Sequence, residues 1–262
     1  MGRLTEIADG VLVATSEQFV TTTTVVTGAD GGCLVIDPAV TVAELAGLAA
    51  ELSGRGLRPV AGWATHPHWD HVLWSAALGD VPRYAAPRAV ATAETERDGL
   101  IDGVQQSAPG HDLKLFGQLV ALPDGAGSIP WDGPTAQVVI HDAHAPGHGA
   151  VFLPAAGVLI AGDMCSDIEI PLPDLAGPDP VGDYETGLDR LAAVERVAGA
   201  AGVRQVVPGH GHVGDAAEFR RRLDLDRAYI AALRRGQKIA DPRLTQDWLR
   251  AEQDQQLQHL AG

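Results

Sequence analysis

The chain has 262 residues, a formal net charge of −15 and 45% hydrophobic residues. This length and composition indicate one globular domain and exclude a disordered or fibrous protein. Only two lysines are present, Lys114 and Lys238, so we expect no basic surface that binds nucleic acid. A small-molecule substrate is therefore expected, and the sequence does not indicate an oligomeric state.

The first residues, MGRLTEIADGVLVATSE, are acidic and polar where a signal peptide would have its apolar region. No hydrophobic run approaches transmembrane length. Cys33 and Cys165 are too few for a disulfide framework and are not spaced like a zinc-binding pair. We expect a cytoplasmic protein with free thiols and no membrane contact.

The first part of the chain has the pattern of an α/β fold. Runs of β-branched and apolar residues predict strands over 11–15, 20–27, 33–36 and 60–64. Thr41 and Glu44 form a capping box, which predicts a helix that ends at Gly54 and Gly56. The segment after the fourth strand lies where α/β sheets usually bind their ligands.

The second part continues the alternation of strands and helices. Strands are predicted over 136–141, 150–153, 157–161 and 203–207, and helices over 88–105, 183–200, 215–237 and 242–260. Asp215 with Glu218 makes a second capping box, and Asp241-Pro242 is typical of a helix start. The glycine- and proline-rich PDGAGSIPWDGP predicts a surface loop in the least regular region, 88–135. We predict one domain over 1–262, with C-terminal helices in 215–262.

Residues 65–71, THPHWDH, concentrate three histidines and an aspartate. In an extended backbone His66 and His68 point the same way, and Asp70 and His71 offer a second direction. Imidazoles and carboxylates cost free energy to bury unless their polar atoms find partners. Both groups are common ligands of zinc and other late transition metals, so the motif predicts two adjacent cations.

Each metal needs three or four ligands, so further ligands are expected elsewhere in the chain. Three candidates stand where a predicted strand meets a loop. They are His148 in APGHG, Asp163 in LIAGDM and His210 in VVPGHG. One sheet edge could bring all of them together.

These ordered motifs resemble the metallo-β-lactamase fold superfamily, and the resemblance extends from the N-terminal strands to about His212. It implies a four-layer αβ/βα sandwich with the site at the top of the central sheets. It also implies two sets of metal ligands joined by a bridging carboxylate. The first set is His66, His68 and His148, the second is Asp70, His71 and His210, and the bridge is Asp163.

A centre of two metals predicts hydrolysis. Two cations about 3.5–4 Å apart lower the pKa of bound water to about 7 and polarise the bond under attack. We expect Asp70 and Asp163 to be the catalytic residues, with Asp70 also orienting the attacking water. Two Zn²⁺ per chain are expected, although the same ligands also accept iron or manganese.

Several neighbouring residues have two interpretations. Thr65 and Asp37 either orient the imidazoles of the ligands or cap a strand end. Trp69 and Tyr184 either line a substrate pocket or pack in the core.

The remaining histidines near the motifs are also ambiguous. His141, His144 and His212 either donate a proton to the leaving group or are ordinary surface histidines.

The fold alone does not select a substrate. We predict hydrolysis of an ester-like bond: a thioester, lactone or carboxylic ester. Ser166 stands where the best-known acyl-homoserine lactonases have tyrosine, which counts against a lactonase of that type without excluding it. His68 stands where flavodiiron proteins have glutamate, so we do not expect oxygen reduction. The loop 166–184 is expected to overhang the site, and its aspartates disfavour a strongly anionic substrate. The alternatives are a β-lactamase, a non-hydrolytic metal-dependent cyclase, a phosphodiesterase and, last, a non-catalytic metal-binding protein.

Overall fold

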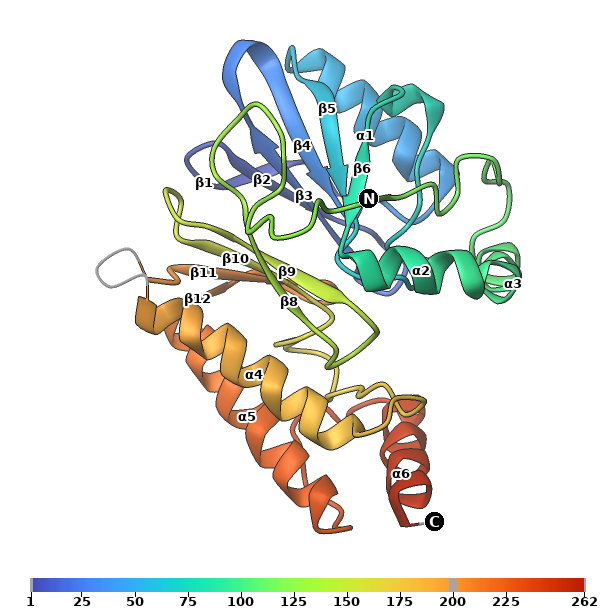
Figure 1. Ribbon diagram of the computed structural model, residues 1–262, viewed down its shortest axis with the longest axis vertical. Helices are drawn as coiled ribbons and strands as arrows, with labels where there is room; N and C mark the ends of the chain where they lie inside the picture. Colours follow the sequence, from blue (N-terminus) through green and yellow to red (C-terminus); the bar gives the residue numbers. More distant parts are fainter. Residues whose placement is uncertain (1, 198–201, 262) are drawn as a thin grey trace.

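Two β-sheets face each other in the computed structural model, which describes residues 2–197 and 202–261, and helices cover their outer faces (Figure 1). The first sheet has seven strands in the order β1-β2-β3-β4-β5-β6-β7, and the second has five in the order β12-β11-β10-β9-β8. This arrangement confirms the expected α/β fold and its four layers.

The first sheet changes from antiparallel to parallel pairing along its width. Its strands are β1 (Thr5–Ala8), β2 (Val11–Thr15), β3 (Thr22–Thr27), β4 (Gly32–Ile36), β5 (Arg58–Trp63), β6 (Arg83–Ala85) and β7 (Val120–Ala121). Pairing is antiparallel from β1 to β4 and parallel from β4 to β7. The carboxyl ends of β4 and β5 therefore lie at the same edge of the sheet.

The second sheet has one parallel pair. Its strands are β8 (Gln137–His141), β9 (His148–Leu153), β10 (Val158–Gly162), β11 (Gln205–Pro208) and β12 (Gly214–Asp215). β10 and β11 are parallel, and the other neighbours are antiparallel. The carboxyl ends of β10 and β11 consequently meet at one edge as well.

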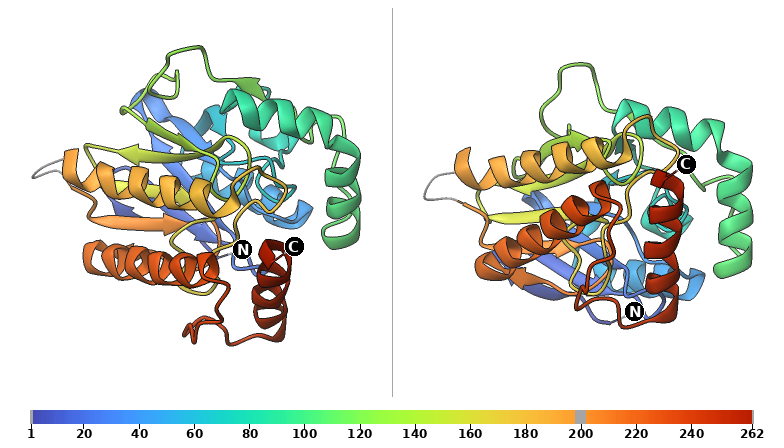
Figure 2. Two further views of the ribbon diagram at one scale, coloured as in Figure 1. Left: turned by 60° about the horizontal axis from the view of Figure 1, so that its bottom comes forward. Right: turned by 90° about the horizontal axis from the view of Figure 1, so that it is seen from below.

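The helices divide between the two sheets. They are α1 (Val42–Gly54), α2 (Pro87–Thr95), α3 (Arg97–Ser107), α4 (Pro180–Val197), α5 (Ala216–Arg234) and α6 (Asp247–Ala261), with short 3₁₀ turns η1 (Ala29–Gly31) and η2 (Ala76–Leu78). In Figure 2, α4 and α5 lie side by side over the second sheet, and α6 stands apart from them near the C-terminus.

Three apolar cores separate the four layers. In β4, Cys33 and Val35 face the helices, whereas Leu34 and Ile36 face the second sheet. Successive side chains of a strand alternate between its faces, so a strand that is buried on both faces needs an uninterrupted apolar run. The CLVI segment of β4 satisfies this requirement. A third core joins the second sheet to α4 and α5.

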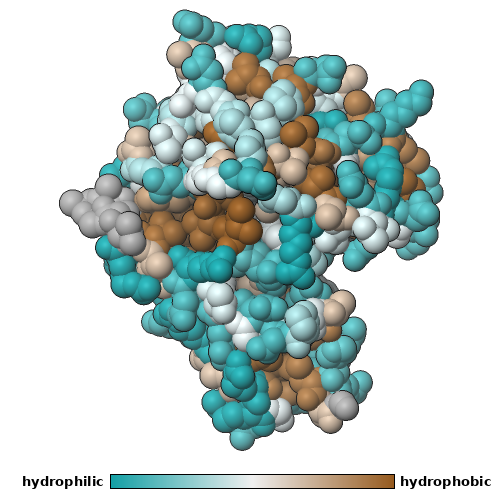
Figure 3. All heavy atoms as spheres, in the orientation of Figure 1, coloured by the Kyte–Doolittle hydropathy of each residue, from teal (hydrophilic) through white to brown (hydrophobic). Residues whose placement is uncertain are grey.

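The face of the molecule drawn in Figure 3 is mostly hydrophilic. On the face drawn in Figure 3, hydrophobic residues form small separate patches among hydrophilic ones. Among the described helices, none combines the length and the apolar character that a membrane span requires. Both cysteines, Cys33 and Cys165, are buried free thiols.

Local sequence signals locate the starts of α1 and α5. The side chain of Thr41 accepts a hydrogen bond from the Glu44 backbone N–H, and Glu44 in turn accepts one from the Thr41 backbone N–H. The Asp215 side chain caps α5 by accepting from the Glu218 backbone N–H. These bonds satisfy backbone donors that the first turn of a helix leaves free. The second bond of the capping box predicted at Asp215 does not form, because the Glu218 carboxylate instead accepts from Arg221 and Arg222.

Other predictions need correction. The single helix expected over 88–105 is two helices that meet at Glu96. The last helix begins at Asp247 and not at Asp241, because Asp241 instead forms a buried ion pair with Arg243, with 2.8 Å between Nη2 and Oδ2. The helix predicted over 183–200 starts earlier, at Pro180, and its residues 198–200 lie outside the described residues.

Candidate metal centre

The histidine motif and the other candidates meet because each follows a strand at the same end of the two sheets. Residues 64–71 follow β5, Asp163 follows β10, and His210 follows β11. The turn 142–147 between β8 and β9 adds His144. Loops at the carboxyl ends of parallel strands are the usual position of ligand sites in α/β proteins.

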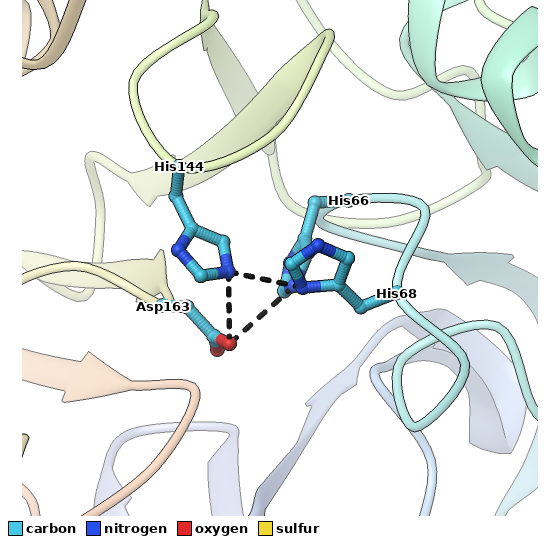
Figure 4. A group of neighbouring side chains, drawn as sticks. All are labelled: His66, His68, His144 and Asp163. Carbon is cyan, nitrogen blue, oxygen red and sulfur yellow. Dashed lines mark hydrogen bonds and ion pairs between the residues drawn. The ribbon is translucent and has the colours of Figure 1, made fainter. Parts of the chain in front are cut away.

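The first group of ligand atoms comes from His66, His68, His144 and Asp163. His68 Nδ1 lies 3.1 Å from His66 Nε2 and 3.0 Å from His144 Nε2. Asp163 Oδ2 lies 3.4 Å from His66 Nε2 and 3.3 Å from His144 Nε2. Figure 4 shows these side chains pointing toward one another, with His66 and His68 on one loop and His144 and Asp163 on two others.

The second group consists of Asp70, His71 and His210. His71 Nε2 and His210 Nε2 are 3.4 Å apart, and Asp70 Oδ2 lies 3.5 Å and 3.3 Å from them, respectively. Asp163 joins the two groups, since its Oδ1 is 3.3 Å from His71 Nε2 and its Oδ2 is 3.3 Å from His210 Nε2. One carboxylate therefore lies within reach of both groups.

The donor set fits a metal ion in each group. Ligand atoms about 2.0–2.1 Å from a tetrahedral zinc ion lie about 3.3–3.4 Å from one another, and the observed separations are 3.0–3.5 Å. Three ring nitrogens that face one point repel each other unless a cation or proton lies between them. In addition, Asp163 Oδ1 is buried and accepts no hydrogen bond from the described residues.

The structure corrects the prediction that His148 completes the first group, because His144 occupies that position. His148 is the first residue of β9 and pairs with His141 across the hairpin, so its ring stays beside β8. It stacks between His141 and His66, with ring centroids 4.6 Å and 5.1 Å away. His144 lies in the connecting turn and projects from the hairpin into the site.

Hydrogen bonds fix the orientation of the ligand rings. Asp37 Oδ2 accepts from His71 Nδ1 at 2.9 Å and from Thr65 Oγ1 at 2.6 Å. Because the Thr65 hydroxyl donates to Asp37, its oxygen accepts from His66 Nδ1 at 3.0 Å. Each of these imidazoles therefore has Nε2 free for a metal, the outer hydrogen bonding that metal-binding histidines normally have.

Backbone carbonyl groups hold two further rings. His144 Nδ1 donates to the Leu172 carbonyl oxygen at 2.8 Å, and His210 Nδ1 donates to the Phe19 carbonyl oxygen at 3.0 Å. Both rings thus also present Nε2 to the centre. These contacts come from distant segments of the chain, and no sequence pattern indicated them.

Without metal, the charges of the two groups differ. Burial alone would lower the pKa of His71 and His210, but the carboxylates of Asp163 and Asp70 raise both pKa values well above the ordinary range. Burial lowers the pKa of His68 to about 3, with the neighbouring His144 adding to the effect. The metal-free site therefore holds protons on His71 and His210 at neutral pH.

Metal binding at pH 7 is expected to release about two protons per chain, because His71 and His210 must lose theirs to become ligands. Calorimetric titration of the metal-free protein in buffers of different ionisation enthalpy measures this number. Release should decrease as the pH rises through the raised pKa values of the two rings, because both rings are then already neutral and only the proton lost by a metal-bound water remains. A release that is absent at pH 7 would contradict the assigned protonation.

Gly162, directly before Asp163, leaves room for the buried ring of His148. Its φ is +59°, and a Cβ there would lie 2.4 Å from His148 Nε2 and 3.1 Å from Thr65 Cβ. We expect Gly162→Ala to lower the free energy of unfolding by about 3 kcal/mol, from overpacking and left-handed strain. The matched control is Gly125→Ala, because Gly125 has a φ of +73° but nothing within 4 Å of its Cβ position. Urea unfolding of the metal-free variants should show a clearly smaller loss of unfolding free energy for Gly125→Ala. Equal losses would show that crowding by His148 and Thr65 does not destabilise Gly162→Ala.

A cavity of about 590 Å³ opens above the two groups, and His68, Asp70, His144, Asp163 and His210 lie on its wall. The rest of the wall is mainly apolar. The apolar residues are Phe19, Val20, Trp69, Ile168, Leu172 and Trp248, and the other polar ones are Glu169 and Gln246. This volume is in the range of small-molecule sites.

The structure places the ambiguous residues of the sequence analysis as follows. Trp69 lines the cavity and also packs against α3, where Gly103 leaves room for its ring. Tyr184 does not line the cavity, because it is buried in the core under α4. His212 lies outside the cavity, mostly exposed and paired with Asp167 at 2.9 Å. His141 is buried, and it is not a surface histidine.

Phe19 and Val20 have strained backbones beside the site. Their φ angles are +57° and +54°, in the left-handed region that β-branched and bulky residues rarely adopt. Such strain costs about 1–3 kcal/mol per residue and persists only where the surroundings enforce it. The hydrogen bond from His210 to the Phe19 carbonyl oxygen is one such constraint.

Comparison with known proteins agrees with this geometry. The family model described as the metallo-beta-lactamase superfamily matches residues 17–231. Because this match covers most of the chain, the protein belongs to the metallo-β-lactamase superfamily. It is an enzyme of the metallo-hydrolase class.

Individual relatives are distant in sequence. A protein of Bacillus subtilis (strain 168) named probable metallo-hydrolase YflN is 26% identical over 196 residues, 65% of this chain and 74% of its own. A beta-lactamase domain protein from Burkholderia ambifaria is 19% identical with a TM-score of 0.68, over 98% of this chain and 86% of that one. TTHA1623, solved in a di-iron-bound form, is 25% identical with a TM-score of 0.60, over 80% and 97% of the respective chains.

Proposed function

We propose that the protein is a dinuclear zinc hydrolase that cleaves an ester-like bond, a thioester, lactone or carboxylic ester, of a small molecule. The observation that supports this most is the position of the two ligand groups. They share Asp163 and lie together in the wall of one small-molecule-sized cavity. A purely structural zinc site is normally enclosed by four ligands and does not open onto such a cavity.

When bound, two metal ions would lower the pKa of a water molecule and polarise the bond that it attacks. The protein's own residues would hold the two ions and orient the water molecule. His66, His68, His144 and Asp163 would hold one ion, and Asp70, His71 and His210 the other, with Asp163 shared. The Asp70 carboxylate faces the cavity, where it can accept a hydrogen bond from a water molecule and so orient it. The apolar wall excludes bulk water, which strengthens these electrostatic interactions.

The ligand types support zinc as the metal. Five imidazoles and two carboxylates suit zinc, although iron and manganese accept the same atoms and cellular availability also matters. The di-iron form of TTHA1623 makes iron the main competitor. Metal analysis of protein purified without added metal, followed by reconstitution with each ion, decides between them.

We further propose a cytoplasmic enzyme whose partner is a small molecule and neither nucleic acid nor membrane. The net charge of −15 supports this proposal, since polyanions such as RNA and acidic lipid surfaces would be repelled. The cavity volume also suits a small molecule.

A panel of substrates tests the proposal: a nitrophenyl ester, an acyl thioester, a lactone, a cephalosporin and a phosphodiester. We expect the metal-loaded protein to hydrolyse an ester, thioester or lactone, and His66→Ala and Asp163→Ala to lose that activity by at least about 100-fold. His259→Ala, at an exposed position of α6, is the matched control and should retain it. If two metals bind but the whole panel stays at background, the hydrolase proposal fails and the cyclase alternative gains support.

A further inference from the structure

Three aromatic side chains from distant segments line the cavity. Phe19 comes from the loop between β2 and β3, Trp69 from the histidine motif, and Trp248 from the first turn of α6. Phe19 and Trp69 meet edge to face, with ring centroids 6.0 Å apart. Phe19 and Trp248 remain 48% and 46% exposed, which is unusual for such large apolar residues. Exposed apolar residues gathered around a cavity commonly mark a binding surface.

The loop that carries Phe19 is held in place before any ligand binds. The Gly211 backbone N–H donates to the Val20 carbonyl oxygen at 3.0 Å, and the Thr22 N–H donates to the Gly209 carbonyl oxygen at 2.7 Å. The Gln18 side chain donates to the Ser107 carbonyl oxygen at 2.8 Å. These bonds fix the strained loop on both sides, so little ordering is required when a ligand binds.

The charges on the cavity wall disfavour an anion. Glu169 is the one carboxylate of the described wall residues that belongs to neither ligand group, and no described residue on the wall is a lysine or arginine. Burial raises the pKa of Glu169 to about 7. Gln246 offers a neutral amide. An anionic substrate group in this part of the cavity would therefore find no basic side chain to bind it.

We propose that the cavity binds a large, apolar and uncharged group next to the scissile bond, packed against Phe19, Trp69 and Trp248. The assignment of this substrate class rests on the proposed hydrolase function. The proposal predicts faster hydrolysis of substrates with large acyl or aryl groups than of acetyl substrates or of substrates whose group has a carboxylate or phosphate.

Neutral acyl thioesters of N-acetylcysteamine, from acetyl to decanoyl, test the proposal by turnover. Each methylene that the cavity buries should raise kcat/KM about threefold to fourfold. We therefore expect about a 100-fold or larger increase between acetyl and octanoyl. A thioester with a carboxylate at the far end of the acyl chain should react at least about 30-fold more slowly than its neutral analogue. Glu169→Gln should reduce this difference in rate between the carboxylate-bearing thioester and its neutral analogue.

In Trp248→Ala, the increase in kcat/KM from acetyl to octanoyl should be severalfold smaller than in the unmodified protein. Val120→Ala is the matched control and should keep the original increase. Val120 is also exposed, at 47%, but it lies on β7 and does not line the cavity. If kcat/KM does not change with chain length while hydrolysis proceeds, the assigned substrate class is wrong and the hydrolase function stands.

A binding measurement tests the pocket without turnover. The neutral fluorescent probe N-phenyl-1-naphthylamine should bind metal-free protein, with affinity reduced at least about fivefold by Trp248→Ala and unchanged by Val120→Ala. Such binding in a protein that hydrolyses none of the thioesters would support the apolar pocket and refute the hydrolase function. Equal affinity of the probe for all three proteins would refute the pocket.

Discussion

Replacing His144 by alanine is expected to remove one of the two metal ions and to lower hydrolysis by at least about 100-fold. The His144 ring supplies Nε2 to the first ligand group, 3.0 Å from His68 Nδ1 and 3.3 Å from Asp163 Oδ2. Two nitrogen ligands and one shared carboxylate would remain in place of three nitrogen ligands and that carboxylate, so the first group should bind its metal ion much more weakly. Metal content per chain and turnover of the same sample measure both effects.

The matched variant is His148→Leu. His148 is equally buried, but neither of its ring nitrogens has a hydrogen-bond partner among the described residues, so an apolar side chain of similar size should replace it. We expect this variant to keep two metals and most of the activity, with a modest loss of stability from altered packing. If His148→Leu loses the metal and His144→Ala retains it, the assignment of the third ligand is wrong.

Replacing Asp37 by asparagine is expected to weaken metal binding about 10–100-fold, because ligand orientation depends on its carboxylate. Asp37 accepts hydrogen bonds from His71 Nδ1, Thr65 Oγ1 and the Thr65 backbone N–H, all in the buried interior. An amide would place N–H groups against some of these donors. The resulting unsatisfied groups should also lower the free energy of unfolding by about 2 kcal/mol.

Asparagine suits this test because Asp37 has a φ of +46°, a conformation that asparagine tolerates well. The control is Asp215→Asn, which makes the same chemical change at the start of α5, where asparagine is an equally good cap. Competition with a fluorescent zinc chelator measures affinity. An affinity for zinc within twofold of the original in Asp37→Asn would show that Asp37 does not orient the ligands.

Local patterns predicted the parts of the fold that local physics controls. The capping box at Thr41 set the start of α1, and the CLVI run identified the strand β4. The start of α6 was wrong because Asp241 pairs with Arg243, which also forms an ion pair with Asp226 of α5, in place of the expected cap. Short strands such as β7 (Val120–Ala121) were not predicted, since two residues give no detectable alternation.

In the site, too, local sequence patterns predicted some features and tertiary contacts determined the others. The sequence motifs indicated most of the side chains that converge at the site. They could not distinguish His144 from His148, which are four residues apart and outside the histidine motif. That distinction depends on the β8–β9 register, in which His141 pairs with His148 and only His144 projects from the turn. The sequence indicated part of the cavity wall through Trp69 and the loop 166–184, which supplies Ile168, Glu169 and Leu172, but not Phe19 or Trp248, which lie in segments without a motif.

Stepwise reconstitution with zinc tests the dinuclear hydrolase most directly. The protein is stripped with a chelator, zinc is added in fractions of an equivalent per chain, and hydrolysis of the best substrate is followed. The structure predicts no activity without metal and full activity only as about two equivalents bind, because the two ligand groups share Asp163. Turnover that survives complete chelation, or that is already maximal at one equivalent, would contradict the account.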